Sequence, residues 1–325
     1  MAGGQERLLR RRIKSIQSTQ KITRAQELIA ASRIVRAQAR VHAAQPYSDA
    51  ISQVVRDLAA LGGATSSPLL RPREVRTVGH IVVAADRGLS GAYNSSVLRA
   101  AEDALAQDRA RGQDYFLVTV GRKAESYFRY REYHVDAAFS GFTDQPRYEH
   151  ARSIGEAVTS AFLEERVDLV DVIFTRFFSI GLQEVERQVL MPLSPDELAV
   201  GAEPGGARAE YEFEPSPEAI LELLLPRYVE ARIFSALLNG AASEHVSRQR
   251  AMKAATDNAG DLITNLSRVM NRARQDAITT EIMEIVGGAE ALRSSKALGS
   301  DDLLADTIEG RHAQLFENHT SASDR

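Results

Sequence analysis

The sequence predicts an α/β domain inserted between an N-terminal and a C-terminal helix that are long enough to pair as an antiparallel coiled coil. All ten prolines of the 325-residue chain lie from Pro46 to Pro226, while glycine is absent from residues 5–61 and occurs only twice in residues 227–286. Because proline costs about 3 kcal/mol and glycine about 1 kcal/mol inside a helix, both ends favour unbroken helices. The middle alternates short β-rich runs with helical stretches, which is typical of an α/β domain.

The first helix is expected over residues 5–61, within an N-terminal segment of residues 1–62 that ends at Gly62 and Gly63. With a rise of 1.5 Å per residue it would be roughly 80 Å long, whereas helices of globular proteins average about 11 to 12 residues. It must therefore pack on the second helix or on partner chains. Its apolar stripe is broad and irregular, and consists of Ile13, Ile16, Ile22, Ala25 and Ile29.

The second helix is expected over residues 227–286, in a C-terminal helical segment bounded at residues 214–292. Near its end, apolar residues recur at alternating steps of four and three, which is the heptad spacing of a coiled coil. These residues are Ile278, Ile282, Ile285, Ala289 and Leu292. The two stripes together predict an antiparallel helix pair that also contacts other surfaces.

The α/β domain is bounded at residues 75–213. Four β-rich runs are predicted to be strands, at residues 79–85, 115–121, 168–175 and 184–192. Helices are expected between them, at residues 95–108, 123–129 and 153–164. Residues 201–208 are rich in glycine and other small residues, which predicts a loop before the second long helix.

Composition excludes several classes of protein. The chain has no cysteine, which rules out thiolate metal sites, disulfide frameworks and thiol redox control. Apolar residues make up 44% of the chain and can form a core, yet no apolar run reaches the roughly 20 residues that span a bilayer. No apolar signal sequence follows Met1 either. The sequence therefore predicts a protein that is neither secreted nor membrane-spanning.

Basic residues are concentrated at the N-terminal end. Residues 1–40 carry ten Lys or Arg against Glu6 and Glu27, a local balance of 10 − 2 = +8, although the whole chain has a net charge of −4. This asymmetry predicts an acidic partner. Nucleic acid or an anionic membrane surface would also attract a basic helix, but residues 1–46 contain no aromatic side chain that could stack on bases. The charges of a solvated coiled-coil face are the plainer alternative.

Residues 86–94 follow the first predicted strand and precede a helix, where α/β sheets often bind phosphate. The sequence Asp-Arg-Gly-Leu-Ser-Gly fits neither glycine-rich fingerprint, and no lysine follows its second glycine, so a structural turn is favoured over a nucleotide site. The seven histidines include no HExxH pair, and no GxSxG sequence marks a serine nucleophile. Neither metal binding nor catalysis is therefore expected of this chain alone.

Three stretches carry a resemblance to a known family: QKITRAQELIAASR at residues 20–33, AMKAATDNAG at residues 251–260 and NRARQDAITTEIMEIVGGA at residues 271–289. Together they closely resemble the γ subunit of F-type ATP synthases, whose signature pattern matches residues 278–289. The turn at residues 86–89 resembles the turn in the Rossmann-like domain of that family. The likeness covers residues 5–292 in the right order.

The resemblance implies an antiparallel coiled coil, flanking an inserted Rossmann-like α/β domain, that stands in a ring of three α and three β subunits. The α/β domain would touch the ε subunit and the membrane-embedded c-ring. The implied function is a rotating central-stalk shaft that couples ion flow through the c-ring to ATP synthesis in the β subunits. The shaft itself would have no catalytic site and bind no cofactor, because ATP, ADP and Mg²⁺ are bound in α and β. Nucleic acid is not an implied partner, and the implied location is peripheral, at the cytoplasmic face of the bacterial cell membrane.

The resemblance also implies contacts by motif position. Basic residues of the first helix would face an acidic segment of β, namely Lys21 and Arg24, with Arg33 and Arg36 as weaker candidates. Polar residues of the second helix would engage a loop of β, namely Arg248 and Gln275, with Thr279 and Glu281 beside them. An apolar tip would turn in a hydrophobic sleeve at the top of the ring, and it consists of Ile282, Ile285 and Val286.

Two features depart from the family pattern. The chain continues past Leu292 through residues 293–325, which are rich in Ser, Asp and Glu and predict a disordered tail. The amphipathic stretch at residues 303–316 leaves a regulatory or anchoring role as the alternative. The redox cysteine insert of chloroplast γ subunits is absent, which excludes thiol control. A dinucleotide-dependent enzyme with helical arms and a basic coiled-coil adaptor for nucleic acid are the rival interpretations from other classes.

Overall fold

The computed structural model describes residues 2–60, 68–193 and 216–317. These residues form two compact units: residues 20–257 make one, and the described residues before 20 and after 257 make the other. Two long helices, α1 (Ala2–Ala60) and α6 (Pro217–Glu317), contribute to both units and flank the remaining elements in the sequence, as predicted. The predicted helix end at residues 62–63 and the predicted loop at residues 201–208 lie outside the described residues.

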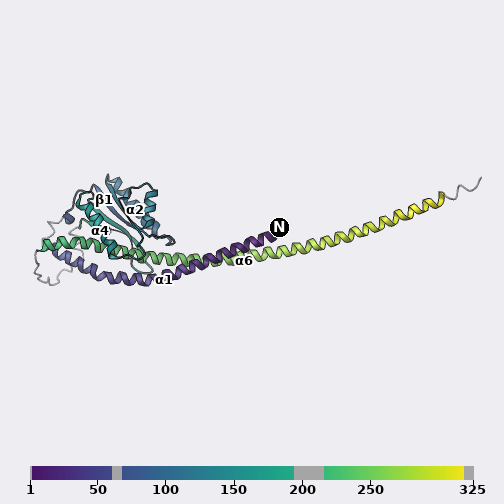
Figure 1. The fold of residues 1–325 in the computed structure, drawn as a ribbon, viewed down its shortest axis with the longest axis horizontal. Helices are drawn as coiled ribbons and strands as arrows, with labels where there is room; N and C mark the ends of the chain where they lie inside the picture. Colours follow the sequence, from purple (N-terminus) through teal and green to yellow (C-terminus); the bar gives the residue numbers. More distant parts are fainter. Residues whose placement is uncertain (1, 61–67, 194–215, 318–325) are drawn as a thin grey trace, which may run out of the picture. The chain divides into compact units, whose positions relative to one another are not determined.

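One sheet lies in the unit of residues 20–257, above the two long helices in the view of Figure 1. It has five strands in the order β3-β2-β1-β4-β5. The strands are β1 (Thr77–Val83), β2 (Asp114–Val120), β3 (Ala137–Phe139), β4 (Leu169–Phe177) and β5 (Gln183–Met191). Strands β1 to β4 are parallel, and β5 pairs antiparallel with β4. The carboxyl ends of parallel strands lie at one edge of a sheet, so the loops that follow β1, β3 and β4 share that edge.

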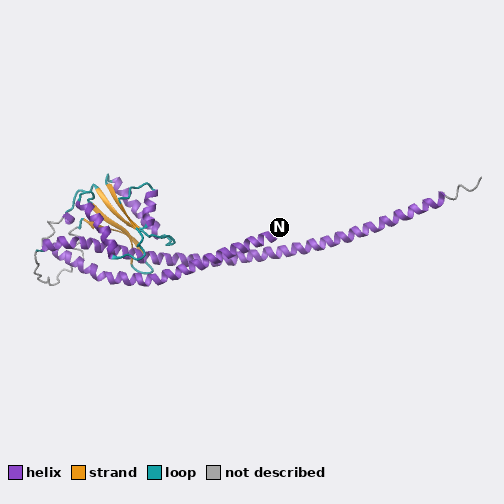
Figure 2. Ribbon diagram, in the orientation of Figure 1, coloured by secondary structure: helices purple, strands orange, loops and turns teal. Residues whose placement is uncertain are grey.

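Helices cover both faces of this sheet (Figure 2). One face carries α2 (Tyr93–Ala110) and α3 (Arg122–Tyr130), while the other carries α4 (Tyr148–Leu163) and part of α6. Successive strand residues point to opposite faces, so Val82 packs with the α2 side and Ile81 with the α4 side. A short 3-10 helix, η2 (Pro68–Leu70), joins the core on the α4 side.

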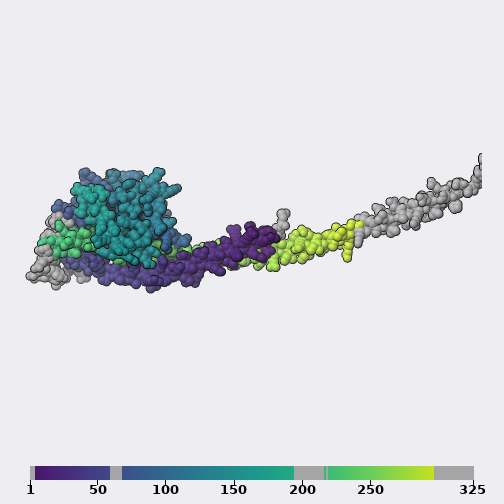
Figure 3. Space-filling view, viewed as in Figure 1, coloured from purple at the N-terminus to yellow at the C-terminus, as the bar shows by residue number. Residues whose placement is uncertain are grey.

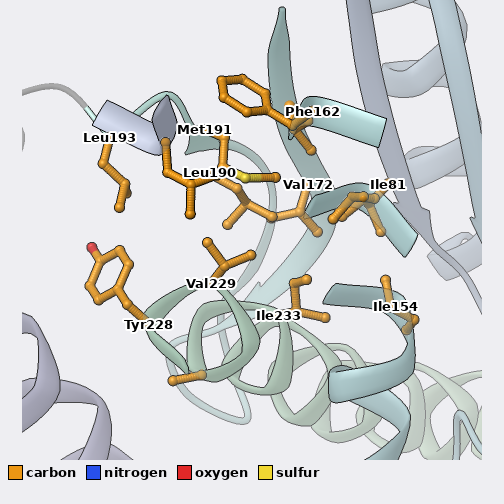
Figure 4. Packing of buried hydrophobic residues seen from close by; sticks show 14 of the residues in the cluster. Ile81, Ile154, Phe162, Val172, Leu190, Met191, Leu193, Tyr228, Val229 and Ile233 are labelled. Atoms are coloured by element: carbon orange, nitrogen blue, oxygen red, sulfur yellow. The ribbon is translucent and has the colours of Figure 1, made fainter. Parts of the chain in front are cut away.

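The larger hydrophobic core makes α6 an integral part of the α/β unit. Figure 4 shows Leu190 and Met191 of β5 near Val229 and Ile233 of α6. All four side chains are almost completely buried. α1 joins the same core through Ile51, Val55 and Leu58. The helix α6 is therefore held by the core of the α/β unit.

The sequence predictions for the α/β elements are confirmed except at one edge. The four predicted strands correspond to β1, β2, β4 and β5, and the three predicted helices lie within or overlap α2, α3 and α4. β3 was not predicted, because Ala137–Phe139 is too short to show an alternating pattern. α6 begins at Pro217 and contains Pro226, whereas the sequence prediction began the helix after that proline.

The helices α1 and α6 meet along a seam that includes polar residues. In the unit of residues 20–257, the buried positions of α1 step by four, three and four, through Thr23, Glu27, Ala30 and Ile34. Thr256 of α6 donates a hydrogen bond from Oγ1 to Thr23 Oγ1 at 2.8 Å. The seam thus has the heptad spacing of a coiled coil but is only partly apolar.

The sequence prediction of this seam is wrong at three positions. Ile22 and Ile29 are 63% and 47% exposed, and Ala25 is exposed as well. The apolar pattern selected the neighbouring stripe because two of the true seam positions, Thr23 and Glu27, are polar. In the other unit, the predicted Ile13 is buried and Ile16 is partly buried.

Helix α6 is uncovered over residues 278–295. Every described side chain beyond Ala277 is exposed, as Figure 3 shows for the helix in yellow-green. Within the described residues no helix covers the predicted heptad, and Ile278, Ile282 and Leu292 are 48%, 54% and 71% exposed. Within the described residues, no helix has both the length and the apolar character needed to cross a membrane.

Residues 293–317 continue α6 as helix, which differs from the predicted disordered tail. The segment contains no proline and several good helix formers, including Ala297, Leu303 and Leu304. Its polar composition favoured disorder, but an existing helix needs no new nucleation to be extended. Residues 318–325 lie outside the described residues.

Candidate functional site at the carboxyl edge of the sheet

The turn after β1 is held closed by its own aspartate. Asp86 Oδ1 accepts hydrogen bonds from the backbone N–H groups of Arg122 (3.1 Å) and Gly141 (2.9 Å), and Asp86 Oδ2 accepts from Thr143 N (3.0 Å). Partial burial alone would raise the pKa of the Asp86 carboxyl, but these donors together lower it below its ordinary value. The Asp86 carboxylate thus already accepts hydrogen bonds from the backbone N–H groups that a bound phosphate would need.

The rest of the turn is shaped by backbone geometry. Leu89 has a φ of 66° and is 64% exposed, so an apolar side chain projects to solvent from a left-handed backbone. Gly91, with a φ of 55°, lies where a Cβ would be 3.6 Å from the Cβ of Ala251 in α6. Asn94 supports the turn by accepting from Ala85 N at 2.9 Å. Gly91 therefore lets helix α6 approach the turn closely.

Helix α6 packs against the carboxyl edge between β1 and β4, where doubly wound sheets usually bind ligands. Ser243 Oγ donates to the carbonyl oxygen of Thr175 at 3.2 Å, and Asn239 Oδ1 accepts from Phe177 N at 3.1 Å. A Cβ on Gly240 would lie 3.1 Å from the Tyr93 hydroxyl oxygen and 3.3 Å from Val83 Cγ1. A larger residue here would need these neighbours to shift by a few tenths of an ångström, so glycine suits this close approach of helix and sheet.

A buried ion pair ties α6 to the turn. Arg248 donates from one terminal guanidinium nitrogen to Glu244 Oε1 at 2.5 Å and to the carbonyl oxygen of Gly88 at 3.3 Å. Arg248 is 8% exposed and Glu244 is 2% exposed. Burial raises the pKa of the Glu244 carboxyl, while the Arg248 guanidinium opposes that rise. The contact of Arg248 with a β subunit stays a prediction; within this chain its guanidinium group contacts Glu244 and Gly88.

Two further buried side chains, His245 and Tyr93, lie near this ion pair. Burial lowers the pKa of His245 to about 4, and it raises the pKa of the Tyr93 phenol above its ordinary value. His245 Nε2 lies 3.3 Å from the carbonyl oxygen of Asp144. Among the described residues, His245 Nδ1 and Glu244 Oε2 are buried without a hydrogen-bond partner. Such groups typically cost about 1 to 3 kcal/mol each, which marks this junction as more than simple packing.

The basic residues predicted on α1 separate into two kinds. Lys21, Arg24 and Arg36 are exposed. Arg24 pairs with Glu27 of its own helix at 2.9 Å, and Arg36 donates to Ser32 Oγ at 3.2 Å. Arg33 is only partly exposed and pairs with Asp144, in the loop after β3, at 2.8 Å. The exposed three remain available to a partner, whereas Arg33 is engaged within the chain.

The residues predicted near the end of α6 are all exposed. Gln275, Thr279 and Glu281 present polar side chains to solvent. The predicted apolar tip is also uncovered, with Ile282 54%, Ile285 66% and Val286 58% exposed. These six residues belong to the second unit, described by residues before 20 and after 257.

Sequence reasoning missed a buried polar network on the α2 face of the sheet. His80 is fully buried, with Nδ1 2.8 Å from Asp171 Oδ1 and Nε2 2.7 Å from Asp108 Oδ2. Arg187 donates from Nε to Asp171 Oδ2 at 2.6 Å. The network links β1, β4, β5 and α2, and its one sequence signal is a histidine within an apolar strand. The described residues contain no His, Asp and Glu cluster suited to a metal ion.

Comparison with known proteins identifies the family. A family model described as ATP synthase matches residues 5–292. The ATP synthase gamma chain of Kineococcus radiotolerans is 47% identical over 297 residues, which cover 90% of this chain and 98% of that protein. The corresponding chain of Mycolicibacterium smegmatis is 44% identical over 304 residues and covers 89% of this chain and 98% of its own length.

A solved structure supports the fold independently. A chain in the Euglena gracilis mitochondrial ATP synthase, in a structure of OSCP, F1 and the c-ring, superimposes with a TM-score of 0.66. The match covers 90% of this chain and 96% of that chain at 16% identity, so it bears on the fold alone. The family model and the curated relatives cover the α/β domain, the turn at residues 86–91 and most of both long helices. This chain therefore belongs to the ATP synthase γ chain family.

Proposed function

We propose that this chain is the rotating shaft of the central stalk of an ATP synthase, coupling ion flow through a c-ring to ATP synthesis in β subunits. The observation that carries the proposal is the state of α6 beyond Ala277. A helix that exposes Ile278, Ile282, Ile285 and Val286 needs a partner surface, because apolar residues at this spacing are normally covered. Membership of the γ chain family supports the ring of ATP synthase subunits as that partner.

A shaft of this kind works through unequal contacts. One asymmetric rod inside three equivalent αβ pairs presents a different face to each pair, so the three catalytic sites differ in conformation and affinity. Turning the rod exchanges these states among the sites. Coupling requires that the contacts of the rod differ in free energy between the states, and binding or release of nucleotide then does work on the rod.

We assign the contacts with β to the exposed members of the predicted set. On α1 these are Lys21, Arg24 and Arg36, and on α6 they are Gln275, Thr279 and Glu281. The apolar tip of Ile282, Ile285 and Val286 is the bearing surface at the top of the ring. Arg33 and Arg248 are left out, because their guanidinium groups already hold Asp144, Glu244 and Gly88.

We further propose that the chain is not catalytic and binds no cofactor, with ATP, ADP and Mg²⁺ held by the α and β subunits. Two features support this. Asp86 takes the backbone donors at the turn after β1, and α6 packs where a dinucleotide would approach a doubly wound sheet. These features also weigh against the rival dinucleotide-dependent enzyme.

The proposed partners are three α and three β subunits, the ε subunit and the c-ring, without nucleic acid. The solved Euglena complex, which contains F1 and a c-ring, supports this assignment through a chain of the same fold. The proposed location follows from the partners: the chain is peripheral, at the cytoplasmic face of a bacterial membrane. The bacterial relatives, such as that of Kineococcus radiotolerans, support this location.

Co-expression with the α and β subunits of one bacterial source tests the proposal. The expected result is a single complex on size-exclusion chromatography, with one copy of this chain per three αβ pairs and ATP hydrolysis far above that of either component. The Ile282→Asp/Ile285→Asp variant should lower complex recovery, because it places charges on the apolar bearing surface. The Arg152→Met variant, which removes an exposed ion pair of α4 with Glu156, is the control and should assemble normally. A monomer that leaves αβ inactive would overturn the proposal.

A further inference from the structure

The three loops at the carboxyl edge of the sheet share one property: each is fastened by side chains from the long helices. The loop at residues 86–91, after β1, is held by Arg248 of α6, which donates to the carbonyl oxygen of Gly88 at 3.3 Å. The loop at residues 178–182, between β4 and β5, is held by Arg250 of α6. Arg250 donates to the carbonyl oxygen of Ile180, and to that of Gly181 at 3.2 Å.

The loop at residues 140–147, after β3, is fastened from both helices. From α1, Arg33 pairs with Asp144 at 2.8 Å, and Arg40 donates to the carbonyl oxygen of Pro146. From α6, His245 lies with Nε2 3.3 Å from the carbonyl oxygen of Asp144. We name the three loops and these five helix side chains the loop collar. All of its members belong to the unit of residues 20–257.

The loops of the collar are also held by hydrogen bonds within and between the loops themselves. Asp86 joins the loop at residues 86–91 to the loop at residues 140–147 through Gly141 N, Thr143 N and the Thr143 hydroxyl group. The loop at residues 178–182 is closed by the backbone hydrogen bond from Ser179 N to Leu182 O at 3.1 Å. These hydrogen bonds limit bending within each loop. A force applied to a loop is therefore transmitted to the strands that flank it.

The collar contacts differ in kind from the apolar contacts that α6 makes in this unit. Between residues 221 and 237, α6 is held mainly by apolar packing, with a hydrogen bond from the Tyr148 hydroxyl group to Glu230. Apolar packing is non-directional, and packed helices can shift by about 1 to 2 Å. Hydrogen bonds and ion pairs to fixed acceptors weaken steeply when their angles change. His245 Nδ1 of the collar and Oε2 of Glu244, the partner of Arg248, are buried without a hydrogen-bond partner among the described residues, where apolar side chains would be less costly.

We propose that the loop collar is the torsional joint of the chain, at which turning load passes between the α/β domain and the helices α1 and α6. Arg40, His245, Arg248 and Arg250 are its positioning residues. They touch no nucleotide and act by keeping the α/β domain from twisting around the helix pair under load. This inference rests on the proposed shaft function and adds to it the residues that resist twist.

Single-molecule rotation of the assembled complex tests the joint. A probe is attached through Tyr130→Cys, which lies on α3 and is 84% exposed, to a chain that otherwise has no cysteine. With the ring of α and β subunits fixed to a surface, the width of the angular fluctuation of the probe measures the torsional stiffness of this chain. The Arg40→Met/Arg250→Met variant removes two fastenings without touching the exposed residues assigned to β. The matched control is Arg129→Met/Arg152→Met, which removes exposed ion pairs inside α3 and α4.

The collar variant should lose torsional stiffness relative to the control, and its ion pumping against a gradient should fall while unloaded ATP hydrolysis is retained. The Arg40→Lys/Arg250→Lys variant, which keeps the charges, should recover part of the stiffness. Equal fluctuation widths in the collar and control variants would overturn the inference. If the double variant does not assemble, Arg40→Met and Arg250→Met measured singly decide by the same comparison. Failure of the shaft proposal would look different, because the unsubstituted chain itself would not rotate.

Discussion

Two stretches of the same helix, α6, both carry large apolar side chains and yet have opposite fates. Leu221, Leu225 and Ile233 are fully buried in the core of the α/β unit. Ile282 and Ile285, in the other unit, are 54% and 66% exposed. Hydrophobicity alone therefore does not decide burial in this helix; the supply of covering elements within the chain does.

The difference teaches that the two stretches serve different partners. The buried stretch is an internal anchor, which fixes α6 to the sheet and to α4. The exposed stretch is a surface that no other described part of the chain covers, as a shaft in a ring requires. Substitutions in the first stretch should therefore change the stability of the chain, while substitutions in the second should change only the assembled complex.

The largest expected effect comes from truncating the anchor. Ile233→Ala should lower the free energy of unfolding by roughly 2 to 5 kcal/mol, because it removes buried methyl groups and leaves a cavity. Ile282→Ala should change it by less than about 0.5 kcal/mol, since its side chain is already exposed. Denaturant unfolding of the purified chain, followed by circular dichroism, measures both. Equal losses would remove the distinction between anchor and bearing surface.

Arg248→Met should be the next most costly change. It leaves the Glu244 carboxyl group, 2% exposed, without its cation, and breaking a buried pair costs roughly 3 kcal/mol. The same unfolding experiment measures the loss, and the exposed arginine of α3 in Arg129→Met is the matched control. If Arg248→Met instead left stability intact but halved ATP hydrolysis in the complex, the original assignment of Arg248 to a β contact would be restored.

Acid should act on the buried part of α6 through His245. Its pKa is lowered to about 4 in the folded chain, against an ordinary value of about 6.5, so the unfolded chain binds its proton first as pH falls. The stabilising contribution is therefore present above pH 6.5 and is lost as pH falls toward 4, by up to about 3 kcal/mol. His245→Gln should flatten this part of the stability profile relative to the unsubstituted chain. Identical pH profiles for the two proteins would contradict the assignment.

The smallest effect is expected at the exposed basic residues of α1. Arg24→Gln should change the stability of the chain by no more than about 1 kcal/mol, because the Arg24 side chain is 58% exposed, although its partner Glu27 is buried. In the assembled complex it should alter the free energy of coupling by about 0 to 1 kcal/mol. The ratio of ion pumping to ATP hydrolysis measures the effect, and a complete loss of coupling would show that a single charge carries the torque.

Much of this fold follows from the sequence because its strongest signals are coarse. The distribution of proline and glycine locates both long helices, and the β-rich runs locate β1, β2, β4 and β5. The seam of α1 could not be found in this way. Its positions include Thr23 and Glu27, whereas the apolar Ile22 beside them faces solvent. A hydrophobic pattern cannot identify a seam that is partly polar.

At the candidate functional site, sequence patterns likewise do not reveal which charged residues are buried. Lys21 and Arg248 look alike as basic residues in family motifs, yet Lys21 is exposed and Arg248 is 8% exposed beside Glu244. The i,i+4 spacing of Glu244 and Arg248 was visible in the sequence, but their burial depends on the turn at residues 86–91 folding against α6. Contacts between segments about 160 residues apart are set by tertiary structure, and local patterns do not encode them.

The most direct test of the account is rotation itself. A complex with α and β subunits is fixed to a surface through its αβ ring. A visible probe is attached to this chain through Tyr130→Cys, on the exposed surface of α3. The account predicts rotation of the probe in one direction when ATP is added, with pauses at three positions, and arrest when ATP is removed. A complex that hydrolyses ATP while the probe stays fixed relative to the ring would contradict the claim that this chain is the shaft.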